Sequence, residues 1–234
     1  MGIMIEHDKR RNQILKKALD VFIEEGFEAA SYQKIADHSK ITRTTLYMYF
    51  RNRQEIFNFS IKQFLAEIEQ DILKIKENTS LSNPVKLKKT LILILSRMEE
   101  NRQLLLVILD YLISLNSSGT AADKVQPSRR STMQRKLKTK IKSTAKKIAI
   151  LPDIRVRRRT IRLRHILSYL IIAGMKTGEL KKINVRTAND MFFGIIEAAF
   201  VRLTVLKRES LSDSKETVEL AVNSLIREQV TGNR

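Results

Sequence analysis

The sequence contains no cysteine, and only 3 of its 234 residues are proline and 7 are glycine. Without cysteine, the chain can form neither disulfide bonds nor cysteine-ligated metal sites. So few prolines and glycines favour long helices interrupted by few turns. Histidine is scarce as well, and His7, His38 and His165 are too scattered to suggest a metal site. We therefore predict no metal and no cofactor.

Long apolar segments are also missing. The first residues, MGIMIEHDKRR, lack the apolar core of a signal peptide, and Glu6 stands where a myristoylation motif needs Ser or Thr. The most apolar run, residues 104–115, contains Asp110 and is much shorter than the roughly 20 residues that a membrane-spanning helix needs. We expect a soluble, cytoplasmic protein that does not insert stably into a membrane.

The formal net charge of +19 suggests an acidic partner such as nucleic acid or anionic lipid. This charge is unevenly placed along the chain. Residues 1–50 hold eight Lys and Arg against seven Asp and Glu, whereas residues 129–164 hold fifteen Lys and Arg and a single acid, Asp153. We call residues 129–164 the basic block. Most of the excess charge is therefore far in sequence from the first fifty residues.

Helical periodicity runs through nearly all of the sequence, because apolar residues recur at spacings of three and four. Gly26 suits the end of a first helix, and Ser31 and Thr42 are residue types that cap the starts of the next two. Pro84 suits the first turn of a later helix. We predict an all-α fold with no strand, a loop at 116–128, and helices at about 9–27, 31–39, 42–50, 56–78, 86–115 (two helices split near 99–102), 133–148, 155–177, 186–207 and 213–230.

Three short helices in the first fifty residues, the last two joined by a tight turn, are typical of a helix-turn-helix. In such a unit the second helix of the motif lies in the major groove of DNA. We predict a three-helix DNA-binding domain at residues 1–55 and a helical ligand-binding and dimerisation domain at residues 56–234.

The stretch EEGFEAASYQKIADHSKITRTTLYMYFRNRQEIF, from Glu24 to Phe57, resembles the DNA-binding domain of the tetracycline-repressor (TetR) family. The matching features are Gly26-Phe27, Ser31, Ile35-Ala36, Ile41 after the turn, the run Thr45-Leu46-Tyr47, and Phe50 ahead of a basic residue and a long fourth helix. The resemblance implies a transcriptional regulator without enzymatic activity. It also implies a homodimer that binds a palindromic operator in double-stranded DNA and releases it when a small-molecule effector enters the second domain.

Two residues depart from the family pattern. Lys40 occupies the turn position that is usually glycine, and a residue other than glycine is strained at positive φ. Thr44 stands in the recognition helix where the family often has glycine, so this helix should be more stable than one with glycine at that position. The turn is therefore either redrawn or maintained at a modest energetic cost.

Arg43 and Thr44 begin the predicted recognition helix and should face outward, while Leu46 and Phe50 face the core. An arginine can donate two hydrogen bonds to a guanine. Tyrosine and threonine hydroxyls suit phosphate oxygens, and the resemblance places a glutamine of the preceding helix and a basic residue of the following helix near DNA as well. The residues predicted to contact DNA are Ser31, Gln33, Thr42, Arg43, Thr44, Tyr47, Tyr49 and Arg53.

The second domain offers weaker signals. Asp110 and Tyr111 interrupt the most apolar helix, and His165 and Tyr169 are one turn apart on another. Ligand pockets between helices are mostly apolar with a few polar groups, so these four residues are candidate ligand contacts. The competing interpretation, a polar group satisfied inside the core or at its rim, carries more weight.

The helix at about 186–207 carries apolar residues on more than one face, which is more than its own domain needs to bury. Pairing with the same helices of a second copy would cover the surplus symmetrically. An ordinary core helix is the alternative. The residues predicted at a dimer interface are Phe192, Phe193, Ile196, Phe200 and Leu203.

The basic block leaves several interpretations open. It suits a solvated surface, an anionic effector such as an acyl-CoA, further contact with DNA or with a neighbouring dimer, or a membrane surface. The alternative to a DNA-binding regulator is accordingly a basic amphipathic protein that binds membrane surfaces or anionic metabolites. An enzyme is less favoured, because the sequence shows no carboxylate pair, nucleophile–histidine arrangement or glycine-rich phosphate loop.

Overall fold

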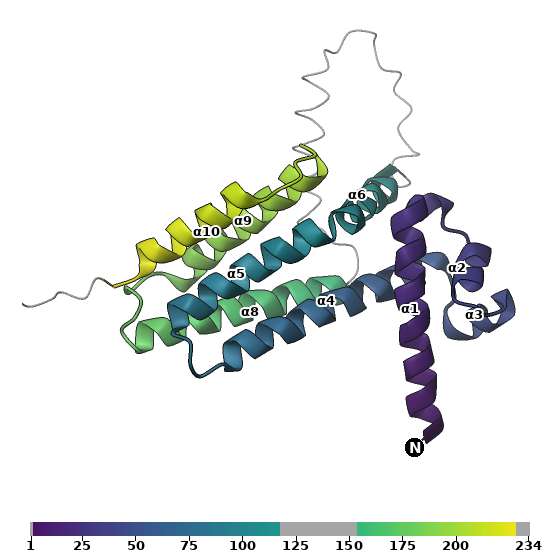
Figure 1. The fold of residues 1–234 in the computed structure, drawn as a ribbon, viewed down its shortest axis with the longest axis horizontal. Helices are drawn as coiled ribbons and strands as arrows, with labels where there is room; N and C mark the ends of the chain where they lie inside the picture. Colours follow the sequence, from purple (N-terminus) through teal and green to yellow (C-terminus); the bar gives the residue numbers. More distant parts are fainter. Residues whose placement is uncertain (1, 118–153, 228–234) are drawn as a thin grey trace, which may run out of the picture. The chain divides into compact units, whose positions relative to one another are not determined.

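The computed structural model describes residues 2–117 and 154–227, and the regular elements in these ranges are all α-helices (Figure 1). An isolated bridge pairs Leu180 with Ile226. The all-α prediction is confirmed for these ranges, whereas most of the predicted loop and the whole predicted helix at 133–148 lie outside them. The helices are α1 (Gly2–Ala29), α2 (Tyr32–His38), α3 (Arg43–Tyr49), α4 (Arg53–Glu77), α5 (Asn83–Glu100), α6 (Arg102–Ser117), α8 (Ile154–Lys176), α9 (Val185–Thr204) and α10 (Ser212–Leu225).

Contacts between residues group the described chain into two units. The first, the N-terminal unit, comprises the described residues up to Ile61 and those from Leu106 to Arg158. The second, the C-terminal unit, comprises residues 62–105 and the described residues from Arg159 onward. The helix α4 continues without a break through the predicted domain boundary at residue 55, so that boundary stays a prediction.

The chain turns sharply at Gly26, whose φ of 80° and ψ of 166° interrupt α1. Only glycine reaches this conformation without strain, so a residue with a side chain would oppose the turn. The prediction that the first helix stops near Gly26 is therefore confirmed in substance, although one further turn, to Ala29, follows. The short segment after the turn carries Phe27 back toward the core, where its ring is buried.

Aromatic rings form the centre of the N-terminal unit. Phe57 of α4 lies 4.9 Å from Phe22, 5.1 Å from Phe27 and 4.8 Å from Tyr111 between ring centroids. These distances and the tilted ring planes are those of favourable edge-to-face pairs. We call Phe22, Phe27, Phe57 and Tyr111 the ring cluster. It joins α1, α4 and the second half of α6 in one core.

In the C-terminal unit, α5, α9 and α10 pack against one another, and α4 runs beside α8 (Figure 1). Glu99 near the end of α5 accepts hydrogen bonds from the backbone N–H of Leu211 and from Lys215 at the start of α10. Burial alone would raise the pKa of Glu99, but these hydrogen bonds together lower it. The carboxylate is therefore held charged at the junction of two helices.

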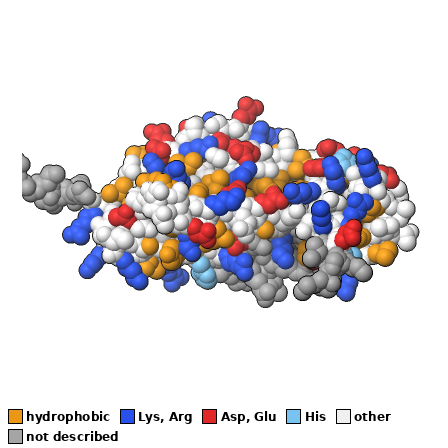
Figure 2. All heavy atoms as spheres, turned by 60° about the horizontal axis from the view of Figure 1, so that its bottom comes forward, with side chains coloured by type: hydrophobic (Ala, Val, Ile, Leu, Met, Phe, Trp, Pro, Cys, Tyr) orange, Lys and Arg blue, Asp and Glu red, His pale blue; other side chains and the backbone are white. Residues whose placement is uncertain are grey.

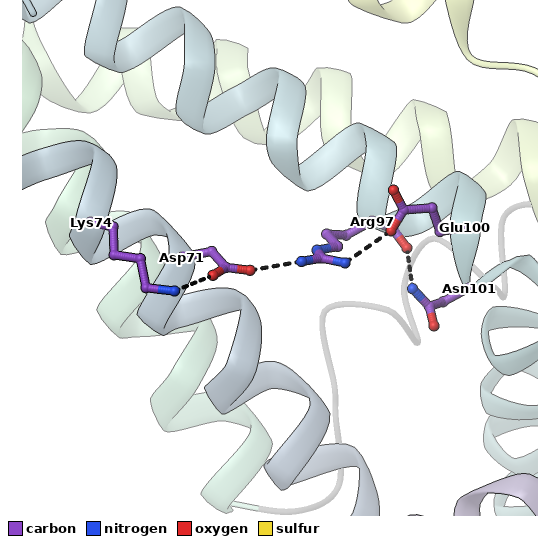
Figure 3. Close-up of polar contacts among 5 residues, drawn as sticks. All are labelled: Asp71, Lys74, Arg97, Glu100 and Asn101. Carbon is purple, nitrogen blue, oxygen red and sulfur yellow. Dashed lines mark hydrogen bonds and ion pairs between the residues drawn. The ribbon is translucent and has the colours of Figure 1, made fainter.

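A second polar network joins α4 to α5 (Figure 3). The guanidinium of Arg97 donates to Asp71 at 2.7 Å and lies 3.0 Å from Glu100, and Lys74 donates to the other oxygen of Asp71 at 3.0 Å. Hydrogen bonds from Arg97 and Lys74 hold the pKa of Asp71 below its usual value. Asn101 donates to the backbone oxygen of Arg97 and so closes the end of α5. All of these side chains are at least partly exposed, so each pair contributes little stability.

Lysines and arginines are interspersed with acidic side chains on the face drawn in Figure 2. Residues 129–153 of the basic block lie outside the described residues. Within the described ranges, no helix is both long enough and apolar enough to span a bilayer.

Candidate nucleic-acid interface

The geometry of α2 and α3 is fixed by two capping residues. The Ser31 hydroxyl accepts a hydrogen bond from the backbone N–H of Lys34 at 3.2 Å, and the Thr42 hydroxyl accepts one from Thr45 at 3.1 Å. Each bond satisfies an amide that the helix itself leaves free, which is worth about 1 kcal/mol. Both predicted caps are confirmed. Their predicted contacts with phosphate stay predictions.

The turn between the two helices keeps its shape although it lacks glycine. Lys40 adopts a φ of 52°, in the left-handed region. Its backbone N–H donates to Asp37, and the backbone N–H of Ile41 donates to Ala36, each at 3.0 Å. The turn is therefore maintained at a cost in backbone strain rather than redrawn.

A stack of side chains fixes α3 against α2. The ring of Tyr32 stacks on that of Tyr47 at 4.5 Å between ring centroids. The Tyr32 hydroxyl donates to the backbone oxygen of Phe50, where α3 ends. Burial, followed by the nearby Tyr47 and Glu55, raises the pKa of Tyr32 to about 12. This hydroxyl therefore remains a donor throughout the neutral range. Tyr32 was not among the predicted residues, although it directly follows the predicted cap Ser31.

Arg43 and Tyr47 form a pair on the surface of α3. The guanidinium of Arg43 donates to the Tyr47 hydroxyl at 3.1 Å and lies 5.6 Å from the centre of its ring. Both side chains are exposed, and Leu46 and Phe50 are buried as predicted. Arg43 is thus presented at the start of the helix with its direction set by Tyr47.

The other residues predicted to contact DNA have differing surroundings. Thr44 is exposed, whereas Tyr49 is partly covered and stacks on His7 of α1 at 4.6 Å. Gln33 of α2 donates to Asp37 of the same helix at 2.8 Å. Arg53 donates to the backbone and carboxylate of Glu28 and covers the ring of Phe27 at 4.5 Å. The structure brings Arg43, Thr44 and Tyr47 together on α3, while Gln33 and Arg53 have partners of their own.

The four candidate ligand contacts are not brought together. Tyr111 is buried in the ring cluster, and its hydroxyl accepts a hydrogen bond from Gln54 of α4 at 2.7 Å. Asp110, in the same unit, is exposed. In the C-terminal unit His165 is exposed, and the ammonium of Lys76 lies over the ring of Tyr169, 4.4 Å from its centroid. Packing accounts for Tyr111 in this structure, and a ligand role for the four residues stays a prediction.

The residues predicted at a dimer interface divide into two groups. Phe192, Phe193 and Leu203 are buried within the chain itself, with the guanidinium of Arg164 4.0 Å from the centre of the Phe193 ring. Ile196 and Phe200 are partly exposed. Of the predicted set, these two alone offer surface to a second copy, and the interface itself stays a prediction.

Residues 14–58 match the family model described as "Bacterial regulatory proteins, tetR family". These residues form a helix-turn-helix of the TetR family. The protein is a DNA-binding transcriptional regulator, as the resemblance over Glu24 to Phe57 implied. The family resemblance noted in the sequence is therefore confirmed over the helix-turn-helix.

Similar proteins extend the likeness over nearly the whole chain. The "Fatty acid metabolism regulator protein" of Bacillus subtilis (strain 168) is 24% identical over 231 residues, which cover 91% of this chain and 94% of that protein. A TetR transcription regulator from Haloarcula marismortui has a similar fold, with a TM-score of 0.70 at 16% identity, covering 94% of this chain and all of that one. The regulator FadR from Bacillus subtilis, solved in complex with stearoyl-CoA, has a TM-score of 0.54 at 23% identity, covering 95% of this chain and 98% of that one.

Proposed function

We propose that this regulator is a repressor that binds a palindromic operator as a homodimer and releases it when an effector binds. The observation that carries the proposal is the way α3 is presented. Two capping hydroxyls and the Tyr32–Tyr47 stack fix the helix, while Arg43, Thr44 and Tyr47 remain exposed. A helix held in this way can enter a major groove without first having to be ordered.

The outward side of α9 and α10 supports the homodimer. Gly194 in the middle of α9 has nothing within 4 Å of where a Cβ would lie, so packing within the chain does not require a glycine there. Glycine in a helix interior costs about 0.5–1 kcal/mol relative to alanine. Met191 lies one turn away on α9, and Leu220 on α10 is 65% exposed. A second copy packing closely over these residues would bury the exposed side chains and explain the glycine, as an isologous interface requires.

The proposed effector is a long-chain acyl-CoA. Support comes from the similar proteins, one a fatty acid metabolism regulator that matches along 94% of its length and the other a structure in complex with stearoyl-CoA. An acyl-CoA combines an apolar chain with anionic phosphates. Such a ligand suits a chain with an excess of basic residues and a helical C-terminal unit with an apolar core.

Binding of the full chain to the DNA upstream of its own reading frame tests the proposal, with a scrambled duplex of the same composition as the control. We expect specific binding tighter than scrambled binding by at least about a thousandfold near physiological salt. Stearoyl-CoA should release the DNA, whereas free CoA and stearate should not. Equal binding to both duplexes would overturn the repressor proposal. Binding to anionic lipid vesicles but to neither duplex would favour the membrane alternative.

Two arginine substitutions sharpen the same assay. Arg43→Ala should reduce the preference for the operator over scrambled DNA, because it removes a donor from the exposed side of α3. Arg186→Ala removes an equal charge from an exposed position at the start of α9 and should leave that preference unchanged. A similar loss in both variants would mean that general charge rather than α3 accounts for binding.

The dimer is tested separately by sedimentation or light scattering. Leu220→Glu places a charge on the proposed interface and should yield monomers, while Glu219→Gln changes an adjacent exposed residue and should not. A Leu220→Glu protein that remains dimeric would show that this side of α10 is not the interface.

A further inference from the structure

One side of α3 faces directly away from the core, and two residues occupy it. Successive residues of an α-helix are about 100° apart around the helix axis. Leu46 is fully buried, and Thr44 and Met48 each lie about 160° from it around the helix. Both of these side chains are exposed. The line on α3 that is farthest from the core therefore runs through Thr44 and Met48.

Met48 stands out on this helix because it cannot donate a hydrogen bond. Its exposure of 78% is the highest of any large apolar side chain in the described residues. The exposed neighbours Arg43, Thr44 and Tyr47 all carry donors, whereas a methionine thioether is at most a weak acceptor. Whatever Met48 contacts in a complex is therefore recognised through apolar contact.

The position of Arg43 differs from that of Met48. Three helical steps place Arg43 about 60° from the buried Leu46, and its guanidinium is held by the Tyr47 hydroxyl at 3.1 Å. The pair lies on the flank of α3 rather than on its outermost line. If α3 enters the groove with its exposed side first, Thr44 and Met48 approach the base edges directly, while the longer side chain of Arg43 can reach them from the flank of the helix.

A major groove presents one apolar group to such a side chain. Guanine, cytosine and adenine expose hydrogen-bond donors and acceptors there, and thymine adds its C5 methyl group. A flexible thioether side chain adapts readily to a single methyl group. Thr44, one turn before Met48, also ends in a methyl group beside its hydroxyl. The outermost line of α3 therefore complements thymine better than any other base.

We propose that Met48 determines part of the sequence specificity by contacting the C5 methyl group of a thymine in each half of the operator. The proposal rests on the proposed function, since it requires α3 to lie in the major groove. It adds a residue that the family resemblance did not single out. It also names the base and the atom that the residue recognises.

The test uses the full chain and the duplex that it enriches from a random-sequence pool. In that duplex each thymine is replaced in turn by uracil, which removes the C5 methyl group and changes nothing else. We expect one position per half-site at which the replacement weakens binding about fourfold, the effect of one buried methyl group. Met48→Ala should bind the thymine and uracil duplexes equally, and Met48→Leu, which keeps an apolar side chain, should retain the preference for thymine.

The possible results separate the two proposals. Failure to enrich any sequence would overturn the proposed function and this inference with it. Enrichment of a sequence whose binding is unaffected by every uracil replacement would overturn the inference alone, as would a Met48→Ala protein that still prefers thymine. Because Met48 is so exposed, the alanine variant should unfold at the same temperature as the unsubstituted chain, and circular dichroism checks this.

Discussion

The N-terminal unit and the C-terminal unit are each stabilised from within by a different kind of contact. Every ring-to-ring contact among the described residues belongs to the N-terminal unit. In the C-terminal unit, ion pairs join helices that are far apart in sequence, as between Lys88 and Glu219 or Arg164 and Asp190. Ion pairs of this kind are scarcer in the N-terminal unit, where Arg53 bonds to Glu28 and Lys34 to Glu25.

The difference reflects the lengths of the helices. α2 and α3 have seven residues each, and a helix of this length is not stable alone in water. Large rings and capping hydroxyls supply the missing stability and fix the direction of α3. The C-terminal unit has no described helix as short as α2 or α3, and most of its buried apolar side chains are aliphatic. Its exposed ion pairs each contribute little stability and can therefore change partners at little cost. Rigid presentation suits a DNA-reading helix, and adjustable contacts suit the proposed binding of an effector.

Removing one ring should have the largest effect. Phe57→Ala leaves a cavity among three rings and should lower the free energy of unfolding by about 3–5 kcal/mol, measured by urea denaturation. Phe57→Leu keeps most of the volume and should cost about 1.5 kcal/mol or less. Equal losses in the two variants would mean that ring geometry, rather than filled volume, stabilises the cluster.

Neutralising Glu99 tests the polar contact between α5 and the start of α10. Glu99→Gln weakens the bonds from Lys215 and the Leu211 amide and should cost about 1–2 kcal/mol at neutral pH. The pKa of Glu99 is lowered in the folded chain, so its contribution is present above the unfolded pKa of about 4.3 and is lost as the pH falls through the lower folded value. The stability difference between the two proteins should therefore shrink below about pH 4.

The control is Glu100→Gln, at the neighbouring exposed residue that pairs with Arg97 within the same helix. We expect a smaller loss, because this ion pair is exposed. A difference between Glu99→Gln and the unsubstituted chain that stayed constant from pH 7 to pH 3 would contradict the assignment of the charge to Glu99.

The hydroxyl of Tyr111 adds a hydrogen bond from Gln54 to the packing of the ring cluster. Tyr111→Phe keeps the ring and removes the bond from Gln54, so it should lower the free energy of unfolding by about 0.5–1.5 kcal/mol. Urea denaturation measures this loss. If Tyr111 were instead a ligand contact, the substitution would weaken effector binding while leaving stability unchanged.

Local signals made much of the N-terminal unit predictable. Gly26, Ser31 and Thr42 act on amides and turns within a few residues of themselves, so their roles follow from the sequence nearby. The split between α5 and α6 likewise matched the polar interruption near residues 99–102. Even the outermost line of α3 could be predicted from the sequence once Leu46 was assigned to the core, because helical geometry then places Met48 on the opposite side.

Contacts between distant segments were not predictable. Glu99 and Lys215 are 116 residues apart, and nothing in either local pattern selects the other as a partner. Helical periodicity showed that α9 is apolar on more than one face. It could not show that the chain's own core covers Phe192 and Leu203 and leaves Met191 and Leu220 exposed. Which apolar face remains uncovered depends on the packing of the whole unit.

The smallest effects distinguish two arginines of α8. Arg162 is exposed and pairs with Glu69 at 3.2 Å, so Arg162→Ala should cost less than about 1 kcal/mol, and less still in high salt. Arg164 pairs with Asp190 and also covers the ring of Phe193 at 4.0 Å. Its removal should cost about 0.5–1 kcal/mol more, because the contact of a cation with a ring is lost as well. Urea denaturation at low and high salt measures both. If the two variants lost similar amounts of unfolding free energy, and both losses disappeared in high salt, the Phe193 ring would contribute nothing. Ion pairs alone would then distinguish the C-terminal unit from the N-terminal unit.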